Sequence, residues 1–81
     1  MKVHVKVRHL SDIEIPISTE YIKLESFLKL CGAAPTGGMA KQWIQDGEVL
    51  VDGAVCLQRG KKLRPDNRVT CLGQTFRVTE A

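Results

Sequence analysis

Two short helical segments, each followed by a glycine, most constrain what this chain can fold into. Residues 24–31 carry apolar side chains at the spacing of one helix face, and Gly32 is placed to end that helix in the left-handed conformation. Thr36 is a suitable N-cap for a second helix, which Gly47 ends. The helical spacing around Trp43 favours a core position for this residue over a base-stacking one. The expected apolar faces consist of Leu24, Phe27, Leu28 and Cys31 in the first segment and of Met39, Ala40, Trp43 and Ile44 in the second.

A β-hairpin signal follows the second helix directly. Residues 49–51 read as a strand, and Asp52-Gly53 predicts a type I′ turn, in which both central residues take positive φ. The sequence therefore predicts an α+β fold in which two short helices pack on a small, mostly antiparallel β-sheet. The later segments are the expected partner strand of the hairpin, two turns and two further strands: 54–57, then turns at 65–67 and 73–74, and strands over 68–72 and 75–79.

The N-terminal residues show the same alternation. Valines alternate with charged residues over 3–7, and isoleucines alternate over 13–17 after a polar turn, which together predict an additional hairpin. Pro16 lacks a backbone donor, so we expect the second of these strands to lie at a sheet edge or to end early. His4 and His9 have no acidic or thiol partners at metal-ligand spacing, and we interpret both as surface residues.

The composition is that of an ordinary globular domain. The chain has 81 residues, of which 43% are hydrophobic and 26% charged, and this predicts one domain with one small core. No apolar run approaches the ~20 residues that span a bilayer. The N-terminus also lacks the apolar segment of a secretory signal, so we expect a cytoplasmic protein.

The formal net charge of +3 is unevenly distributed. Residues 1–22 and 69–81 are each balanced, so the whole excess lies between Lys23 and Arg68. From residue 59 to residue 68, five basic residues face a single acid, Asp66. Such a local patch is expected of a protein that binds a phosphate backbone. Charge alone is equally compatible with a solvated loop whose lysines and arginines aid solubility.

The pair Gly37-Gly38 requires an explanation, because each glycine costs roughly 1 kcal/mol relative to alanine inside a helix, and less in its first turn. One explanation is tight packing of the two helices across the short turn at 33–35. The other is close approach of a phosphate, which the free N–H groups and the positive end of the helix dipole attract. Both explanations can hold together.

The three cysteines, Cys31, Cys56 and Cys71, are far apart and form no Cys-x-x-Cys pair. Neither a disulfide framework nor a zinc site is indicated, and we interpret all three as reduced structural thiols. An enzyme built on Cys56 or Cys71 with His4 or His9 as its base has no support in the spacing.

Residues 21–78 resemble the small RNA-binding domain first described in ribosomal small-subunit protein four, in which two short helices and a β-hairpin form the αL motif. The family's hydrophobic helix ending in Gly is matched by residues 24–32, and its Val-x-Val-(Asn/Asp)-Gly hairpin by residues 49–53. Two further motifs are similar to those of the stand-alone bacterial branch, the YbcJ-like or YaaA-like proteins. They are Thr36-Gly37-Gly38-Met39-Ala40-Lys41 and Arg59-Gly60-Lys61-Lys62-Leu63.

The resemblance implies an αL-motif domain over residues 21–79, with residues 1–20 as an N-terminal β-hairpin extension packed on it. It also implies non-catalytic binding of structured RNA, with ribosomal RNA or ribosomal particles as the first expectation and with no cofactor, metal, small-molecule substrate or membrane. The implied surface joins the start of the second helix to the basic loop. Its residues are Thr36, Gly37, Gly38, Lys41, Arg59, Lys61, Lys62, Arg64 and Lys29.

The sequence departs from the family pattern in two places. Gly37 stands where many members have Arg, which shifts the expected contact to backbone N–H groups and to Lys41. Residues 1–12 lie outside the pattern, and they are expected to extend the sheet, to cover an exposed edge or to make a dimer contact. We expect a monomer, with a dimer through the N-terminal hairpin as the alternative.

The alternative function is a protein-interaction module that uses the basic loop or the N-terminal sheet edge. Among the nucleic acids, the scarcity of aromatic residues argues against a stacking platform for single strands and favours recognition of a structured RNA by its shape.

Overall fold

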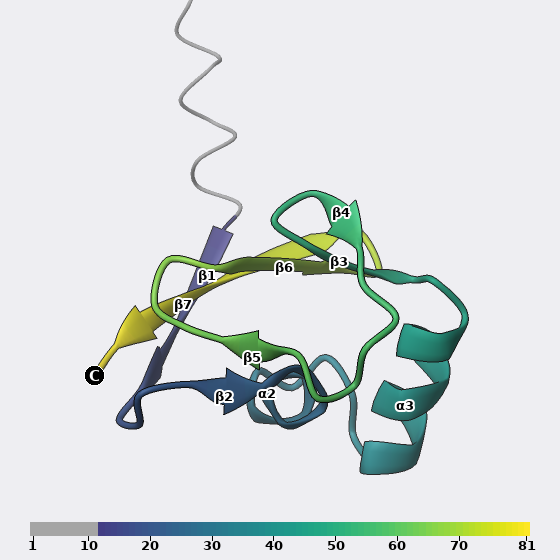
Figure 1. The fold of residues 1–81 in the computed structure, drawn as a ribbon, viewed down its shortest axis with the longest axis horizontal. Helices are drawn as coiled ribbons and strands as arrows, with labels where there is room; N and C mark the ends of the chain where they lie inside the picture. The colour runs from purple at the N-terminus through teal and green to yellow at the C-terminus, as the bar shows by residue number, and fades with distance from the viewer. Residues whose placement is uncertain (1–11) are drawn as a thin grey trace, which may run out of the picture.

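A five-stranded sheet carries both helices on one of its faces (Figure 1). The structure is a computed structural model that describes residues 12–81. The strand order is β1-β7-β6-β3-β4; β1 pairs with β7 in parallel, and the other pairs are antiparallel. The predicted α+β fold with a mostly antiparallel sheet is therefore confirmed. The strands of this sheet are β1 (Asp12–Ile17), β3 (Val49–Val51), β4 (Ala54–Val55), β6 (Arg68–Cys71) and β7 (Gln74–Glu80).

The two helices begin and end where the sequence predicts. In α2 (Leu24–Leu30), three apolar side chains are buried, and Gly32 follows at φ +81°. In α3 (Gly37–Gln45), Ala40 and Ile44 are buried, and Trp43 is partly buried against the core. Met39 was expected on the apolar face of this helix, but 42% of it is exposed. The reason is its position in the first turn of α3, the end that lies farthest from the sheet (Figure 1).

The hairpin between β3 and β4 has the predicted turn. Asp52 and Gly53 have φ values of +51° and +86°, as a type I′ turn requires, and Val51 pairs with Ala54. The partner strand is shorter than the predicted 54–57, because after Cys56 donates its N–H to Val49 (3.0 Å) the chain leaves the sheet. The last turn is also shifted by one residue, since Leu72 and Gly73, at φ +54° and +78°, occupy it instead of 73–74.

β1 is an edge strand of the sheet formed by the described residues, as Pro16 predicted. Its neighbour is β7, and Arg77 of β7 binds Glu14 of β1 through an ion pair of 2.6 Å. The first strand of the predicted N-terminal hairpin, residues 3–7, lies outside the described residues, as do His4 and His9. The division of the chain near residue 20 stays a prediction.

The described residues form one core, which lies between the helices and the inner face of the sheet. Phe27 of α2 and Phe76 of β7 meet there edge to face, with ring centroids 6.4 Å apart. No helix of residues 12–81 is long and apolar enough to cross a membrane. The buried core residues are Ile17, Leu24, Phe27, Leu28, Ala34, Ala40, Ile44, Val49, Val51, Leu63, Val69, Cys71, Phe76 and Val78.

Candidate nucleic-acid interface

The start of α3 presents backbone donors to solvent. The Thr36 hydroxyl oxygen caps the helix by accepting from the Met39 N–H at 3.2 Å, and the Thr36 carbonyl accepts from Ala40 at 3.2 Å. The N–H groups of Gly37 and Gly38 precede the first intrahelical bond, and neither donates a hydrogen bond within residues 12–81. Because both glycines are exposed, these donors are open to an acceptor that arrives from solvent.

Helix packing does not account for the two glycines. A Cβ atom on Gly37 would meet only the end of the flexible Lys29 side chain, at 3.9 Å, and one on Gly38 would meet only the Thr36 hydroxyl, also at 3.9 Å. Both are ordinary van der Waals distances, so the structure has room for alanine at either position. The explanation by tight helix–helix packing is therefore not supported.

The same geometry brings Lys29 to the start of α3. Lys29 is exposed in the last turn of α2, and its ammonium group lies beside Gly37. A positive charge and two free N–H groups thus face the same region, which is a favourable arrangement for one anion.

The basic loop, residues 59–64, contains a short strand that the sequence did not predict. Lys62–Leu63 form a strand, β5, which pairs antiparallel with β2 (Ile22–Lys23) immediately before α2. Sequence reasoning treated residues 59–64 as a loop, because a two-residue strand has too few positions to show alternation. The signal that could have identified β5 is Leu63, an apolar residue among cations, which is completely buried.

This loop also caps α2 with its backbone. The N–H groups of Leu24 and Glu25 donate to the carbonyls of Lys61 (2.8 Å) and Arg59 (3.1 Å), respectively. The N-cap residue Lys23 supplies no side-chain bond, so these carbonyls satisfy donors that the helix itself leaves open. The backbone of the loop is thereby fixed to α2, while the side chains of Arg59, Lys61 and Lys62 remain exposed.

A hydrogen-bonded chain fixes the far end of the loop to the hairpin. The Asp52 carboxylate accepts from the side chain of Asn67 (2.7 Å) and from the N–H of Arg68 (2.9 Å). The Asn67 side-chain oxygen accepts in turn from the N–H of Arg64 (2.7 Å). Sequence reasoning assigned Asp52 and Asn67 to turns and missed this connection, which joins residues distant in the chain.

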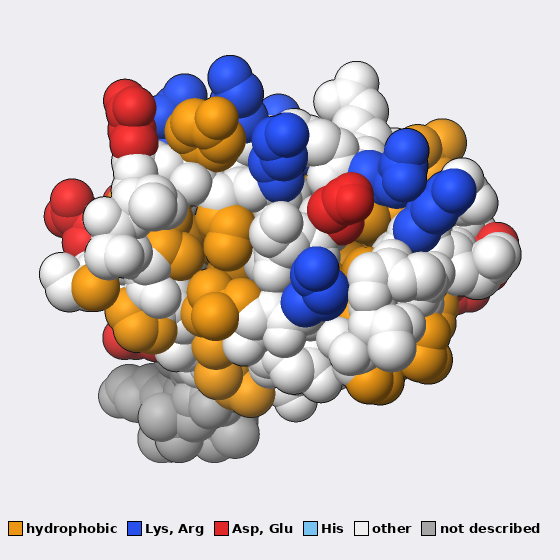
Figure 2. All heavy atoms as spheres, turned by 90° about the horizontal axis from the view of Figure 1, so that it is seen from below, with side chains coloured by type: hydrophobic (Ala, Val, Ile, Leu, Met, Phe, Trp, Pro, Cys, Tyr) orange, Lys and Arg blue, Asp and Glu red, His pale blue; other side chains and the backbone are white. Residues whose placement is uncertain are grey.

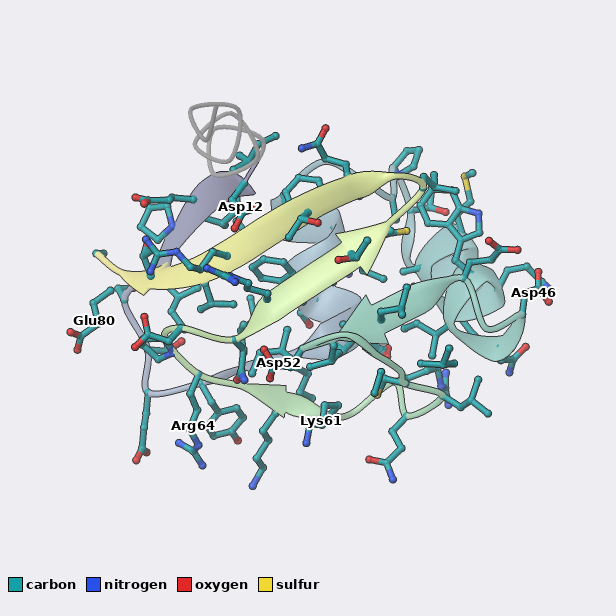
Figure 3. All side chains as sticks on the ribbon, turned by 90° about the horizontal axis from the view of Figure 1, so that it is seen from above. Asp12, Asp46, Asp52, Lys61, Arg64 and Glu80 are labelled. Atoms are coloured by element: carbon teal, nitrogen blue, oxygen red, sulfur yellow. The ribbon has the colours of Figure 1, made fainter. Side chains whose placement is uncertain are left out.

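The predicted site residues fall into two groups separated by the length of α2. The seven residues of α2 span about 10 Å, with the basic loop at the first end and Lys29 and the start of α3 at the second. Figure 2, which views the molecule from below, shows Lys and Arg side chains spread over the upper part and the middle of this side, with an acidic side chain among them. Figure 3 shows Lys61 and Arg64 projecting from the β5 side of the molecule, away from the five-stranded sheet.

Lys41 and Arg64 are at the margins of this surface. Lys41 is exposed one turn into α3, and Arg64 follows β5, where it forms an exposed ion pair of 3.7 Å with Glu20. Arg68 points elsewhere, because its guanidinium contacts Asp12 on β1 at 3.3 Å.

Burial affects two of the three thiols. Burial raises the pKa of Cys71, with smaller contributions from Cys31 and Glu48, and burial also raises the pKa of Cys31. Both thiols are therefore protonated at neutral pH. Residues 12–81 contain no cluster of three or more His, Cys, Asp or Glu side chains that could hold a metal ion.

Comparisons with known proteins agree on one family. The family model described as the S4 domain matches residues 15–79. The probable ribosome maturation protein RlbA of Bacillus subtilis (strain 168) is 47% identical over 49 residues, which cover 60% of this chain and 69% of that protein. The solution structure of YbcJ from E. coli, described as having an αL motif involved in RNA binding, superimposes with a TM-score of 0.62. It is 29% identical and covers 85% of this chain and 86% of its own.

Proposed function

Because the chain belongs to the S4 domain family, we propose that it is a cytoplasmic, non-catalytic RNA-binding protein that recognises structured RNA, with ribosomal RNA as the first target. RNA binding is supported by the αL motif shared with YbcJ, and the ribosomal target by the likeness to a probable ribosome maturation protein. The observation that carries the proposal is the pair of free N–H groups at Gly37 and Gly38, which lie beside the ammonium group of Lys29.

In this proposal, the two groups of residues contact different phosphates of the RNA. Gly37 and Gly38 donate to one phosphate, whose charge Lys29 balances, and Lys41 adds charge nearby. Arg59, Lys61 and Lys62 contact further phosphates about 10 Å away, at the opposite end of α2, with Arg64 at the margin. Because the backbone of both groups is fixed by hydrogen bonds, the spacing between the phosphate sites is fixed as well.

The aromatic residues support recognition of shape over stacking. Of the four aromatic residues, Phe27 and Phe76 are buried, Trp43 packs against the core, and Tyr21 is half-buried with two cations over its ring. A surface that reads phosphate positions without stacked bases suits a folded RNA. If about four to six phosphates are neutralised, the logarithm of the affinity should fall with the logarithm of the salt concentration at a slope of roughly −3 to −5.

The test is a fluorescence titration with a structured ribosomal RNA fragment at several salt concentrations. The variant Lys61→Glu/Lys62→Glu should weaken binding strongly and flatten the salt slope. A matched pair separates position from net charge: Lys61→Gln/Lys62→Gln and Gln45→Glu/Leu72→Asp each lower the formal charge by two. The second pair changes exposed residues outside the proposed surface, so it should bind nearly as the wild type does.

Two results would contradict the proposal. Equal losses in the matched pair would mean that only net charge matters, and the surface would be wrong. No binding of the wild type at low salt would favour the alternative, a protein-interaction module that uses the basic loop on an acidic partner.

A further inference from the structure

Tyr21 contacts two cations near the end of the basic loop, Lys62 and Arg64. The Lys62 ammonium is 4.9 Å from the centroid of the Tyr21 ring, and the Arg64 guanidinium carbon is 5.7 Å from it. Both distances are within the range of a cation–π interaction. Tyr21 itself is half-buried, so part of this residue packs against its neighbours.

The strand pairing explains this arrangement. β2 and β5 pair with Ile22 opposite Leu63 and Lys23 opposite Lys62, and extending the antiparallel register by one residue places Tyr21 opposite Arg64. Side chains alternate along a strand, so Lys62 and Arg64 share the outer face while Leu63 points into the core. The same register puts Lys23 on the outer face opposite Lys62, which concentrates like charge there.

An aromatic ring suits this position better than a carboxylate. A carboxylate would hold the cations by neutralising them, whereas the face of a ring attracts a cation through its quadrupole and leaves the positive charge in place. Lys and Arg side chains lose considerable conformational entropy when they are ordered at an interface. A cation already held over a ring loses less of that entropy when a phosphate arrives.

We propose that Tyr21 is a positioning residue of the RNA-binding surface, which holds Lys62 and Arg64 ready for neighbouring phosphates without itself reducing their charge. The ion pair of Arg64 with Glu20, at 3.7 Å, is exposed to solvent, so a phosphate can displace it. This inference rests on the proposed function, because it assigns Tyr21 a task in binding RNA. Tyr21 carries no signal of this role in the sequence, since neither cation is near it in the chain.

The first test needs no RNA. In the free protein, ring currents should shift the NMR signals of the Lys62 and Arg64 side-chain methylenes in the wild type and in Tyr21→Phe. These shifts should disappear in Tyr21→Leu, which keeps an apolar side chain but removes the ring. Unshifted signals in the wild type would overturn the positioning proposal, whatever the protein binds.

The second test measures RNA affinity in a double-mutant cycle. Tyr21→Leu should weaken binding about fivefold to tenfold, and Tyr21→Phe should stay within about twofold of the wild type, in line with a cation–π contact at a partly exposed site. In the Lys62→Gln/Arg64→Gln background, Tyr21→Leu should have no further effect. Urea unfolding of each variant shows whether any loss merely follows stability.

The outcomes separate the two proposals. An equal loss from Tyr21→Leu in both backgrounds, or a failure of Tyr21→Phe to restore binding, would reject the positioning role while RNA binding stands. A wild type with shifted methylene signals that binds no RNA would reject the proposed function, and with it the role of Tyr21 in binding.

Discussion

At the scale of single residues, Asp52 combines two requirements that few side chains meet together. Its backbone has a φ of +51°, which Asp and Asn tolerate better than most residues. Its carboxylate accepts hydrogen bonds from Asn67 and from the backbone of Arg68. The hairpin turn thus also anchors the chain at the end of the basic loop. This double role gives a physical reason for the Asn or Asp at this position of the family's hairpin pattern.

We predict that Asp52→Ala lowers the free energy of unfolding by about 1–2 kcal/mol, because two exposed hydrogen bonds and a favourable left-handed residue are lost together. Asp52→Asn should lose less, since its amide oxygen still accepts from Arg68 and its backbone tolerates the same φ. Urea unfolding measures both variants. Equal stability of Asp52→Ala and the wild type would mean that the network contributes nothing.

The thiols of Cys71, which is buried, and of Cys31, which is partly buried, are expected to make the free energy of unfolding depend on pH in the alkaline range. Desolvation raises the pKa of Cys71 and of Cys31 in the folded state, so the unfolded thiols ionise first, near their ordinary pKa of about 8.5. The stabilisation is complete below that pH and is lost as the pH rises toward the raised values. We therefore predict that the free energy of unfolding falls above about pH 9, and that it falls less steeply in Cys71→Ala.

Alkylation provides the direct check on the same thiols. In the native protein, Cys71, which is 2% exposed, should react with iodoacetamide much more slowly than in the urea-unfolded protein, as mass spectrometry of peptides can show. Rapid native labelling of Cys71 would contradict this and would reopen the possibility of cysteine chemistry.

At the scale of elements, the first turn of α3 has residues that the stability of a helix does not explain. Its first turn contains two glycines although a Cβ atom would fit at either position. A helix that was selected for stability alone would have alanine there. The glycines keep the first N–H groups unshielded, which is an advantage only if something outside the helix accepts from them.

We predict that Gly37→Ala/Gly38→Ala is at least as stable as the wild type, and more stable by up to about 1 kcal/mol, because alanine favours the helix and neither glycine has a positive φ. The same variant should bind RNA several-fold more weakly, because its methyl groups would lie near the proposed phosphate. Urea unfolding and RNA titration on one preparation measure both effects. A loss of stability would indicate a packing role, and unchanged binding would remove the phosphate from this position.

The elements themselves show what sequence reasoning could reach. Local signals found both helices, the cap at Thr36 and the Asp52-Gly53 turn, because each depends on residues that are neighbours in the chain. The pairings β2–β5 and β1–β7 were missed, because they join segments far apart in the chain and the strand β5 has only two residues. The candidate site could likewise be predicted only in part. Motifs identified its residues, but the position of Lys29 beside Gly37 and the contact of Tyr21 with two cations depend on tertiary structure.

At the scale of the whole molecule, β1 links the N-terminal part of the described chain to its last strand. It pairs with β7 along its entire length, from Asp12–Thr75 to Ile17–Glu80, and Ile17 is 6% exposed in the core. Sequence reasoning placed residues 1–20 in an extension beside the αL motif. The pairing indicates that residues 12–17 contribute directly to the stability of the sheet.

We predict that a chain of residues 21–81 loses cooperative unfolding, because removal of β1 exposes the edge of β7 and deletes a core side chain. In the full chain, Ile17→Ala should cost about 2–4 kcal/mol, whereas Ile13→Ala, at a position 44% exposed, should cost far less. Circular dichroism and urea unfolding give both answers. A stable 21–81 chain would confirm the boundary near residue 20.

The parallel pairing of β1 with β7 also governs the order in which the protein can fold as it is synthesised. β1 leaves the ribosome before any other described strand, whereas its partner β7 is the last of the described strands to be made. The β3–β4 hairpin joins residues that are neighbours in the chain, whereas the isoleucines of β1 remain unpaired until residues 74–80 have been made. A chain that lacks residues 74–80 therefore has an unfinished sheet, in which the isoleucines of β1 are open to chaperones.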